Sequence, residues 1–284
     1  MNLSNVIYIS DFFLEDIIGG GELNDDVLCG LLLDEHLSVR KIRSHLVTPS
    51  FLRDNLNCFY IISNFINLRK NVLDLITEKV KYIIYEHDHK YLSGRNPGFF
   101  ENFLAPKSKI VNYNFYKNSK RIIAQSSFHK EIMKKNLKLD NIENISGNLW
   151  TSRDLEFLRN LSKVEKNNRY AILRSNIAHK NTSESIRYCN AKGYKYSLVS
   201  SSNYHNFLSK LGSNNKFVFF PKTPETLSRV VVEARMMNMG TIINKNVGAS
   251  YEEWFSLKGC DLVDYMTNKR HEVTQKIMGI MNEK

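Results

Sequence analysis

Short apolar runs alternate along the first half of the chain with longer amphipathic stretches. The runs predict buried parallel strands, which are continuously apolar, and the stretches predict helices, whose apolar positions recur every three to four residues. The strands are expected at Val6–Ser10, Ser38–Ile42, Cys58–Ser63, Lys81–Tyr85 and Arg121–Gln125, and the helices at Glu22–Glu35, Phe65–Thr77 and Ser127–Asn136. This order indicates a parallel sheet with helices on both faces.

The alternation stops at the polar, glycine-containing stretch Asn144–Trp150 and then restarts. We interpret this stretch as a hinge between two domains, residues 1–148 and 149–284. In the second domain, strands are expected at Tyr170–Leu173, Tyr196–Val199, Phe217–Phe220, Thr241–Asn244 and Asp261–Tyr265, and helices at Thr182–Ala191, Tyr204–Leu211, Leu227–Asn238 and Thr267–Asn282. The predicted fold class is α/β, with two Rossmann-like domains facing a cleft. The C-terminal helix is a candidate to pack back on the first domain.

The composition is that of a globular protein, with 42% hydrophobic and 24% charged residues. No run approaches the roughly 18 uninterrupted apolar residues that a membrane span needs. The first residues lack a positive segment and already include Asp11, so they predict a strand rather than a signal peptide. The four cysteines are scattered without metal-ligand spacing, which indicates reduced thiols. A cytoplasmic protein is expected, with peripheral membrane association as an option.

The net charge of +11 is unevenly distributed. Residues 1–148 carry 19 basic and 17 acidic side chains, whereas residues 149–284 carry 21 and 12. An anionic small molecule bound by the second domain explains this excess as well as a polymer does. In the first domain, Lys107–Lys138 contains nine basic residues and one acidic residue, Glu131. This segment is either the solvated face of a helix or a patch for lipid headgroups, a phosphorylated acceptor or nucleic acid.

The segment Phe217–Gly248 predicts a strand, a loop, a helix and a second strand. Glu225 and Glu233 lie eight residues apart at the loop and on the helix, so both carboxylates can face the crevice at the carboxyl ends of the strands. The start of the helix is expected just after Pro224, where a proline costs little. Free backbone N–H groups at that start would suit a pyrophosphate, and the residues that carry them are Thr226, Leu227 and Ser228.

This spacing resembles the E-x7-E motif of retaining glycosyltransferases with the GT-B fold, notably glycosyltransferase family 4. The segment that begins at Glu233 also resembles that family's E-A-x4-G-x-P-V-I-x-x-x-x-G pattern. The resemblance implies that Glu225 contacts hydroxyl groups of the donor sugar and that Glu233 contacts the nucleotide ribose. Thr226 and Ser228 stand where the family has glycines, and Thr241 stands where it has a proline.

Arg174 and Lys180 follow the first strand of the second domain, at a spacing similar to that of an Arg and a Lys in the family. By resemblance, they grip the diphosphate and help the nucleotide to leave. Such cations are needed because departure of a nucleoside diphosphate develops negative charge on phosphate oxygens. The alternative is a pair of ordinary surface cations. The resemblance also implies a nucleotide-sugar co-substrate, with a UDP-sugar favoured over a GDP-sugar, and chemistry that requires no metal.

A glycine-rich turn, GGGEL at Gly19–Leu23, follows the first strand. Gly20 and Gly21 lie where an α/β domain places a phosphate-binding or acceptor-binding turn. The turn resembles the G-G-x-E segment that opens the first helix in many family 4 enzymes. It does not match G-x-G-x-x-G, which argues against a dinucleotide-dependent oxidoreductase.

The polar segment after Lys81–Tyr85 contains His87, Asp88 and His89. By resemblance, His87 lies near the donor sugar and the acceptor, with His89 as the second choice. A pair of His87 and Asp88 would orient an acceptor hydroxyl, and Arg95 would line the same mouth. Alternating ligands at three consecutive positions point in opposite directions, so we expect no metal site.

We therefore expect a hexosyltransferase-type glycosyltransferase that moves a sugar from a nucleoside-diphosphate sugar to an acceptor, with retention of configuration. Its donor would be held by residues 149–284 and its acceptor by residues 1–148. The acceptor is left open among a glycan, a lipid and a modified nucleic acid. The alternative is an inactive GT-B-like protein that binds nucleic acid or an anionic membrane through Lys107–Lys138.

Overall fold

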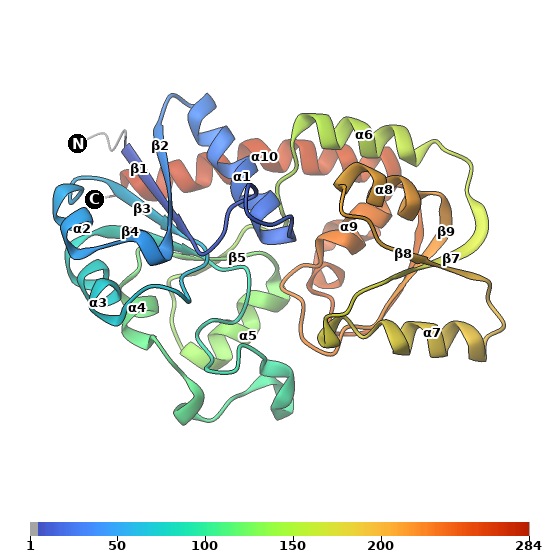
Figure 1. Ribbon diagram of the computed structural model, residues 1–284, viewed down its shortest axis with the longest axis horizontal. Helices are drawn as coiled ribbons and strands as arrows, with labels where there is room; N and C mark the ends of the chain where they lie inside the picture. Colours follow the sequence, from blue (N-terminus) through green and yellow to red (C-terminus); the bar gives the residue numbers. More distant parts are fainter. Residues whose placement is uncertain (1–4, 284) are drawn as a thin grey trace. The chain divides into compact units, whose positions relative to one another are not determined.

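Two parallel β-sheets organise the chain, for which the computed structural model describes residues 5–283 (Figure 1). The backbone divides into two units. One unit contains the chain up to Gln125, the segment Lys130–Ile145 and the residues from Arg270 onward. The other contains Ser126–His129 and Ser146–Lys269.

The sheet of the first unit has six strands in the order β2-β1-β3-β4-β5-β6, all parallel. Its strands are β1 Asn5–Ser10, β2 Ser38–Arg43, β3 Phe59–Ile62, β4 Lys81–Tyr85, β5 Ile122–Ala124 and β6 Ile142–Asn144. The central strands are buried on both faces, as parallel sheets covered by helices require. Alternate residues serve opposite faces: Ile7 and Ile9 join one core cluster, while Val6 and Tyr8 are buried on the other side.

The helices of this unit are α1 Gly20–Asp34, α2 Pro49–Asp54, α3 Lys70–Lys79, α4 Tyr113–Asn118 and α5 Ser127–Leu137. Leu52 of α2, Val72 of α3, Phe115 of α4 and Met133 of α5 pack into the same cluster as Ile7. These four helices therefore cover one face of the sheet. Burial of this continuous apolar face is the main source of stability for the unit.

The sheet of the second unit has four parallel strands in the order β10-β9-β7-β8. Its elements are α6 Ser152–Ser162, β7 Asn167–Leu173, α7 Thr182–Ala191, β8 Tyr196–Val199, α8 Tyr204–Gly212, β9 Asn214–Phe219, α9 Arg229–Met236 and β10 Gly240–Ile243. Helix α7 covers one face, whereas α6, α8 and α9 cover the other (Figure 1). The predicted α/β class with parallel sheets is confirmed.

The last helix, α10, runs without interruption over Gly259–Asn282. The predicted strand Asp261–Tyr265 is therefore wrong. The buried residues of α10 include Leu262, Val263, Met266, Val273 and Ile277. They recur at intervals of three, four and seven residues, which places them on one face of a helix. A five-residue segment is too short to distinguish the two states.

The residues of α10 beyond Arg270 pack on the first unit, as the sequence suggested. Lys276 lies 3.4 Å from Glu143, and Arg121 lies 3.0 Å from Glu283. Ile280 and Met281 are buried on the same part of the helix.

The predicted helix Phe65–Thr77 begins only at Lys70. The residues before it form a loop, because the Asp11 carboxylate accepts hydrogen bonds from the N–H groups of Ile66 and Asn67. The polar stretch Asn144–Trp150 lies between β6 and α6, which begins after Thr151 caps it through a bond from the Asp154 N–H.

Candidate functional site

The loop between β9 and α9 holds Glu225 by its backbone. The Glu225 N–H donates to the carbonyl of Asn246 at 2.7 Å, and the Gly248 N–H donates to the carbonyl of Glu225 at 3.1 Å. A Cβ on Gly248 would lie 2.4 Å from the carbonyl oxygen of Thr226 and 2.8 Å from that of Glu225. Only glycine allows this close approach of two backbone segments, so Gly248 fixes the position of Glu225.

Lys180 and Glu225 form an ion pair, with Nζ 2.8 and 3.0 Å from the two carboxylate oxygens. Lys180 ends a short helical turn, Ala178–Lys180, that follows β7. The next residue, Asn181, donates from its amide to the carbonyl of Phe220 at 2.9 Å and so ties this turn to the loop after β9. Because β7 and β9 are paired, parallel neighbours, the two predicted residues meet at the carboxyl ends of the strands.

Arg174 lies at the end of β7 and is exposed. Its N–H donates to the carbonyl of Val199, which holds the backbone to the neighbouring strand. Within residues 5–283, its guanidinium takes part in no ion pair. A cation so placed is available to a ligand.

Helix α9 begins at Arg229 rather than at Leu227. Ser228 is the cap residue and has a left-handed backbone with φ of 76°. The carbonyl of Leu227 accepts from the Ala249 N–H, and that of Thr226 accepts from the Ser126 hydroxyl at 2.5 Å. The expected helix-start N–H groups of Thr226, Leu227 and Ser228 thus belong to a loop, because its backbone pairs with the segment around Gly248 instead of coiling.

Glu233 lies inside the second unit, where three donors converge on one of its oxygens. Oε1 accepts from Tyr204 Oη at 2.6 Å, Arg229 Nε at 2.9 Å and Trp150 Nε1 at 3.0 Å. Oε2 accepts no hydrogen bond from any described residue. The Glu233 side chain is 3% exposed.

Burial raises the pKa of the Glu233 carboxyl, and the Arg229 guanidinium opposes that shift. Burial also raises the pKa of Tyr204 well above its ordinary value, so its hydroxyl stays a donor. Arg229 lies 4.4 Å from the ring centroid of Trp150 and donates to the carbonyl of Leu149 at 2.6 Å. The charges of Arg229 and Glu233 thereby offset each other at little exposure.

Three members of this cluster were not predicted. Arg229 precedes Glu233 by four residues on the same helix, a spacing that signals a helical ion pair. Trp150 and Tyr204 come from the segment before α6 and from α8. No local pattern connects them to Glu233.

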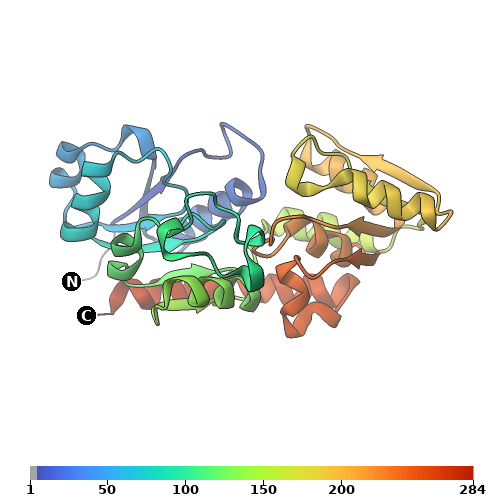
Figure 2. The same cartoon turned by 90° about the horizontal axis from the view of Figure 1, so that it is seen from below.

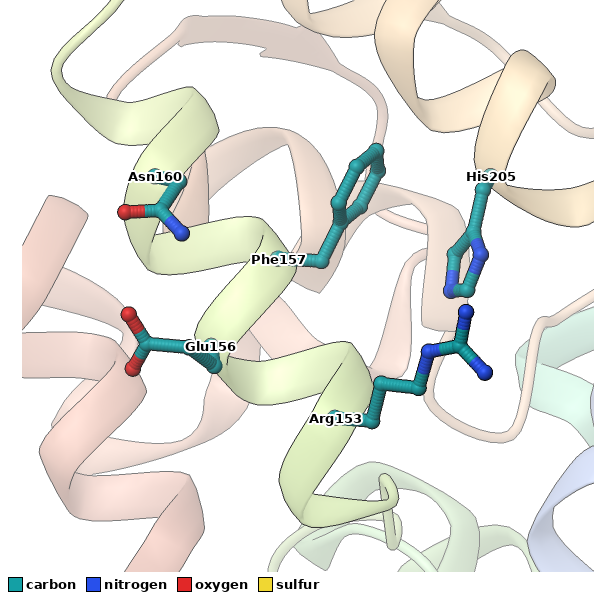
Figure 3. A pocket seen from close by; sticks show the side chains of 5 residues that line it. All are labelled: Arg153, Glu156, Phe157, Asn160 and His205. Carbon is teal, nitrogen blue, oxygen red and sulfur yellow. The ribbon is translucent and has the colours of Figure 1, made fainter.

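A separate pocket of about 330 Å³ lies between α6 and α8 (Figure 3). The side chains of Arg153, Phe157 and His205 face one another there, whereas Glu156 points away. His205 Nε2 lies 2.8 Å from Asp154 Oδ1, and its ring lies 4.6 Å from that of Phe157. None of the predicted donor-binding residues lines this pocket.

His87 follows β4 in the first unit and is held at both ring nitrogens. Nε2 is bonded to Oδ1 of Asp25, and Nδ1 accepts from the amide nitrogen of Gln125. Asp25, which is buried, also accepts from Tyr8 Oη at 2.8 Å and from Ser63 Oγ at 2.5 Å. In this arrangement the His87 ring carries its proton on Nε2, and Asp25 fixes its orientation.

The contacts of His87 and Asp88 described here go to different residues. Asp88 instead lies 3.5 Å from the guanidinium of Arg95, because consecutive residues after a strand point in different directions. His89, the second choice, is buried and its Nδ1 lies 3.1 Å from the Tyr91 hydroxyl. Asp25 was not predicted as the partner, since it lies on α1, far from His87 in the sequence.

Gly20 and Gly21 form the first turn of α1. A Cβ added to Gly21 would lie 3.6 Å from the ring of His87, which is ordinary contact distance. The glycine-rich turn and the histidine therefore lie side by side in the first unit, at the carboxyl ends of their strands.

A fully buried ion pair anchors the segment that carries His87. Lys90 Nζ donates to Glu86, and Tyr116 Oη donates to the other oxygen of the same carboxylate. The Asp88 N–H also donates to Glu86 at 3.0 Å. Both charged side chains have 0% exposure. No local pattern distinguishes this pair from surface charges.

In the described part of the chain, no group of three or more His, Cys, Asp or Glu side chains is placed to hold a metal ion. None of the described helices is both long and apolar enough to cross a bilayer. The four cysteines are free.

No protein-family model matches the sequence, and no curated protein matches it significantly. Among solved structures, the chain is similar to Anabaena Alr3699/HepE in complex with UDP and glucose, with a TM-score of 0.55 and 12% identity over 97% of this chain and 92% of that one. It is also similar to sucrose-phosphate synthase from Thermosynechococcus elongatus (TM-score 0.59, 11% identity, 98% and 99% covered). A glycosyltransferase from Rickettsia africae ESF-5 is a further neighbour (TM-score 0.53, 14% identity, 100% of both chains). The chain has the GT-B fold that these structures share.

Proposed function

We propose that this protein is a nucleotide-sugar-dependent glycosyltransferase of the hexosyltransferase type. The observation that carries the proposal is the pair of Lys180 and Glu225 at the carboxyl ends of β7 and β9. This edge of a parallel sheet is where open α/β folds bind ligands. The structures of Alr3699/HepE with UDP and glucose, which share the fold, support the same reading.

On the donor side, Lys180 and the exposed Arg174 would bind the diphosphate, Arg174 as a planar fork and Lys180 as a point charge. Glu225 would accept hydrogen bonds from hydroxyl groups of the hexose. Glu233 would accept from a ribose hydroxyl through Oε2, the oxygen that receives none of the three internal donors. Backbone groups of the 226–228 loop would contact the same ligand.

The transfer breaks the bond between the anomeric carbon and the β-phosphate oxygen, and both electrons of that bond go to the oxygen. The cations Lys180 and Arg174 stabilise this developing charge. The acceptor oxygen bonds to the anomeric carbon from the face that the nucleotide leaves, so configuration is retained. The proton of the acceptor hydroxyl passes to the departing phosphate.

On the acceptor side, residues 1–148 would position the hydroxyl nucleophile. His87, whose ring is oriented by Asp25, is the candidate to contact the acceptor. Asp88 and Arg95 are exposed enough to contact an acceptor, whereas the burial of His89 makes it a packing residue. The acceptor is a glycan, a lipid or a modified nucleic acid.

The donor is a UDP-sugar in preference to a GDP-sugar, and the chemistry needs no resident metal. The test is to titrate UDP and GDP calorimetrically and to follow hydrolysis of UDP-glucose as release of UDP. Because a hydrogen bond to a charged group contributes about 1.5–3 kcal/mol, Lys180→Ala should weaken UDP binding by roughly ten- to a hundredfold. Glu225→Gln should abolish most hydrolysis without weakening UDP binding, since it removes a sugar contact and releases Lys180.

The matched controls are Lys195→Ala and Glu253→Gln, two exposed side chains of the second unit. Both should bind UDP like the unchanged protein. If neither nucleotide binds, or if Lys180→Ala binds UDP as tightly as Lys195→Ala, the proposal is wrong. If anionic partners bind equally well to the unchanged protein and to Glu225→Gln, that result instead favours the alternative of an inactive GT-B-like protein.

A further inference from the structure

The 97–109 loop of the first unit displays large apolar side chains to solvent. Phe99 is 78% exposed and Leu104 is 54% exposed. Single apolar residues on a surface are ordinary, but two such side chains on one short loop form a local apolar surface. We call Phe99 and Leu104 the apolar tips.

The Asn136 side chain of α5 bonds to this loop. The Asn136 amide donates to the carbonyl of Phe103 at 2.8 Å and its oxygen accepts from the Ala105 N–H at 2.9 Å. The backbone on both sides of Leu104 is therefore bonded to one residue, while the Leu104 side chain points into solvent. Figure 2 shows the loop beside α5.

The loop also has strained backbone. Asn102 has φ of 51° and Phe103 has φ of 61°. A bulky residue in the left-handed region is uncommon and persists only where surrounding structure enforces it. Here the enforcing contacts are those from Asn136. The result is a fixed display of apolar side chains rather than a loose loop.

Lysines occur on the loop and next to the residue that bonds to it. Lys107 and Lys109 are exposed on the loop itself, Lys134 and Lys135 precede Asn136 on α5, and Lys138 follows the end of that helix. Glu131 is the only acidic residue between positions 107 and 138. Apolar side chains next to lysines are typical of surfaces that enter the interface of an anionic bilayer.

We propose that the 97–109 loop docks this protein on an anionic lipid surface. Phe99 and Leu104 would enter the boundary between headgroups and acyl chains, and the lysines would contact lipid phosphates. Nucleic acid would pair with the lysines but would leave the aliphatic Leu104 in water. The inference does not depend on the proposed transferase activity.

The test is sedimentation of the full chain with vesicles of phosphatidylcholine, with and without phosphatidylglycerol. The unchanged protein should sediment with the anionic vesicles only, and less so at high salt. Phe99→Ser/Leu104→Ser should weaken binding by about tenfold or more, because burial of apolar area is lost. Lys107→Glu/Lys109→Glu should weaken it by at least about twentyfold, since each lysine near an anionic surface strengthens binding about fivefold.

The controls match the variants in type and spacing. Leu56→Ser changes another exposed leucine of the first unit, and Lys79→Glu/Lys81→Glu reverses two exposed lysines with the same separation as Lys107 and Lys109. Both should sediment like the unchanged protein. The proposal fails if the protein does not sediment with anionic vesicles, or if Phe99→Ser/Leu104→Ser sediments like the unchanged protein. It also fails if duplex DNA displaces the protein from vesicles and the binding of DNA itself requires Phe99.

Discussion

At the scale of single residues, Gly248 determines the geometry of the loop that carries Glu225. Two carbonyl oxygens and the Ser126 hydroxyl lie within 2.8 Å of the place where its Cβ would stand. Two of these atoms are backbone and cannot move without moving Glu225 itself. The glycine is therefore required by the close approach of two chain segments, rather than by an unusual backbone angle.

Gly248→Ala should lower the free energy of unfolding by about 1–3 kcal/mol through overpacking, and should separate Glu225 from Lys180. Gly30→Ala is the control, because nothing lies within 4 Å of the added Cβ on α1. It should raise stability by about 0.5–1 kcal/mol, as alanine favours a helix over glycine. Urea denaturation measures the free energy of unfolding of both variants. If Gly248→Ala is as stable as Gly30→Ala, the chain accommodates the added Cβ at Gly248 without cost.

The residues that were predicted from the sequence share a local pattern. Glu225, Lys180 and Arg174 each follow a strand that could be recognised, so their place at one sheet edge follows from the order of elements. Asp25 and Trp150 have no such signal, because each meets its partner through tertiary packing. Their contacts could therefore be identified only from the structure.

At the scale of elements, β4, β8 and α7 were predicted at their observed bounds. α2 and α4 were not predicted, because six-residue helices are too short to show a period. The start of α9 was misplaced by two residues, because pairing of Glu225 with Val247 keeps the preceding segment extended.

The segment after β4 depends on its buried ion pair. Lys90→Met leaves the Glu86 carboxylate without its cation in a site with no exposure, which should lower the free energy of unfolding by about 3–5 kcal/mol. Lys70→Met removes the partner of Asp74 in an exposed pair and should change stability by no more than about 1 kcal/mol. Urea denaturation of both variants makes the comparison.

A double variant separates charge from packing in this segment. Glu86→Gln/Lys90→Met removes both charges; the amide oxygen can still accept from the Asp88 N–H, and the amide NH2 can donate to the Tyr116 hydroxyl oxygen. It should recover much of the stability that Lys90→Met loses. If it is no more stable than the single variant, the loss comes from packing of the lysine stem.

At the scale of the whole molecule, the two parallel sheets were predictable because each repeats the same alternation of strand and helix. The continuous helix α10 was not, because the short segment Asp261–Tyr265 near its start is also compatible with a strand. α10 contributes Leu262 and Met266 to the core of the second unit, and its residues from Arg270 onward belong to the first.

Ile277→Ala should therefore destabilise the first unit by about 2–5 kcal/mol, because Ile277 is fully buried on α10. Gly279→Ala, at an exposed position of the same helix with nothing within 4 Å, should stabilise it by about 0.5–1 kcal/mol. Trp150 and Trp254 both lie in the second unit, so their fluorescence reports that unit. Because the helix is continuous, we expect Ile277→Ala to shift the midpoints of the fluorescence and circular dichroism transitions together. Separate midpoints would show that the two units unfold independently.

The ion pair at the carboxyl ends of β7 and β9 means that Lys180 has its counter-ion within the protein itself. Under the proposed function, an arriving diphosphate competes with Glu225 for Lys180, and only this exchange releases the carboxylate to receive a hexose. A free sugar has no phosphate that could displace Glu225 from Lys180, so it meets a carboxylate that is already paired. Discrimination against unactivated sugars would then begin before any bond is broken.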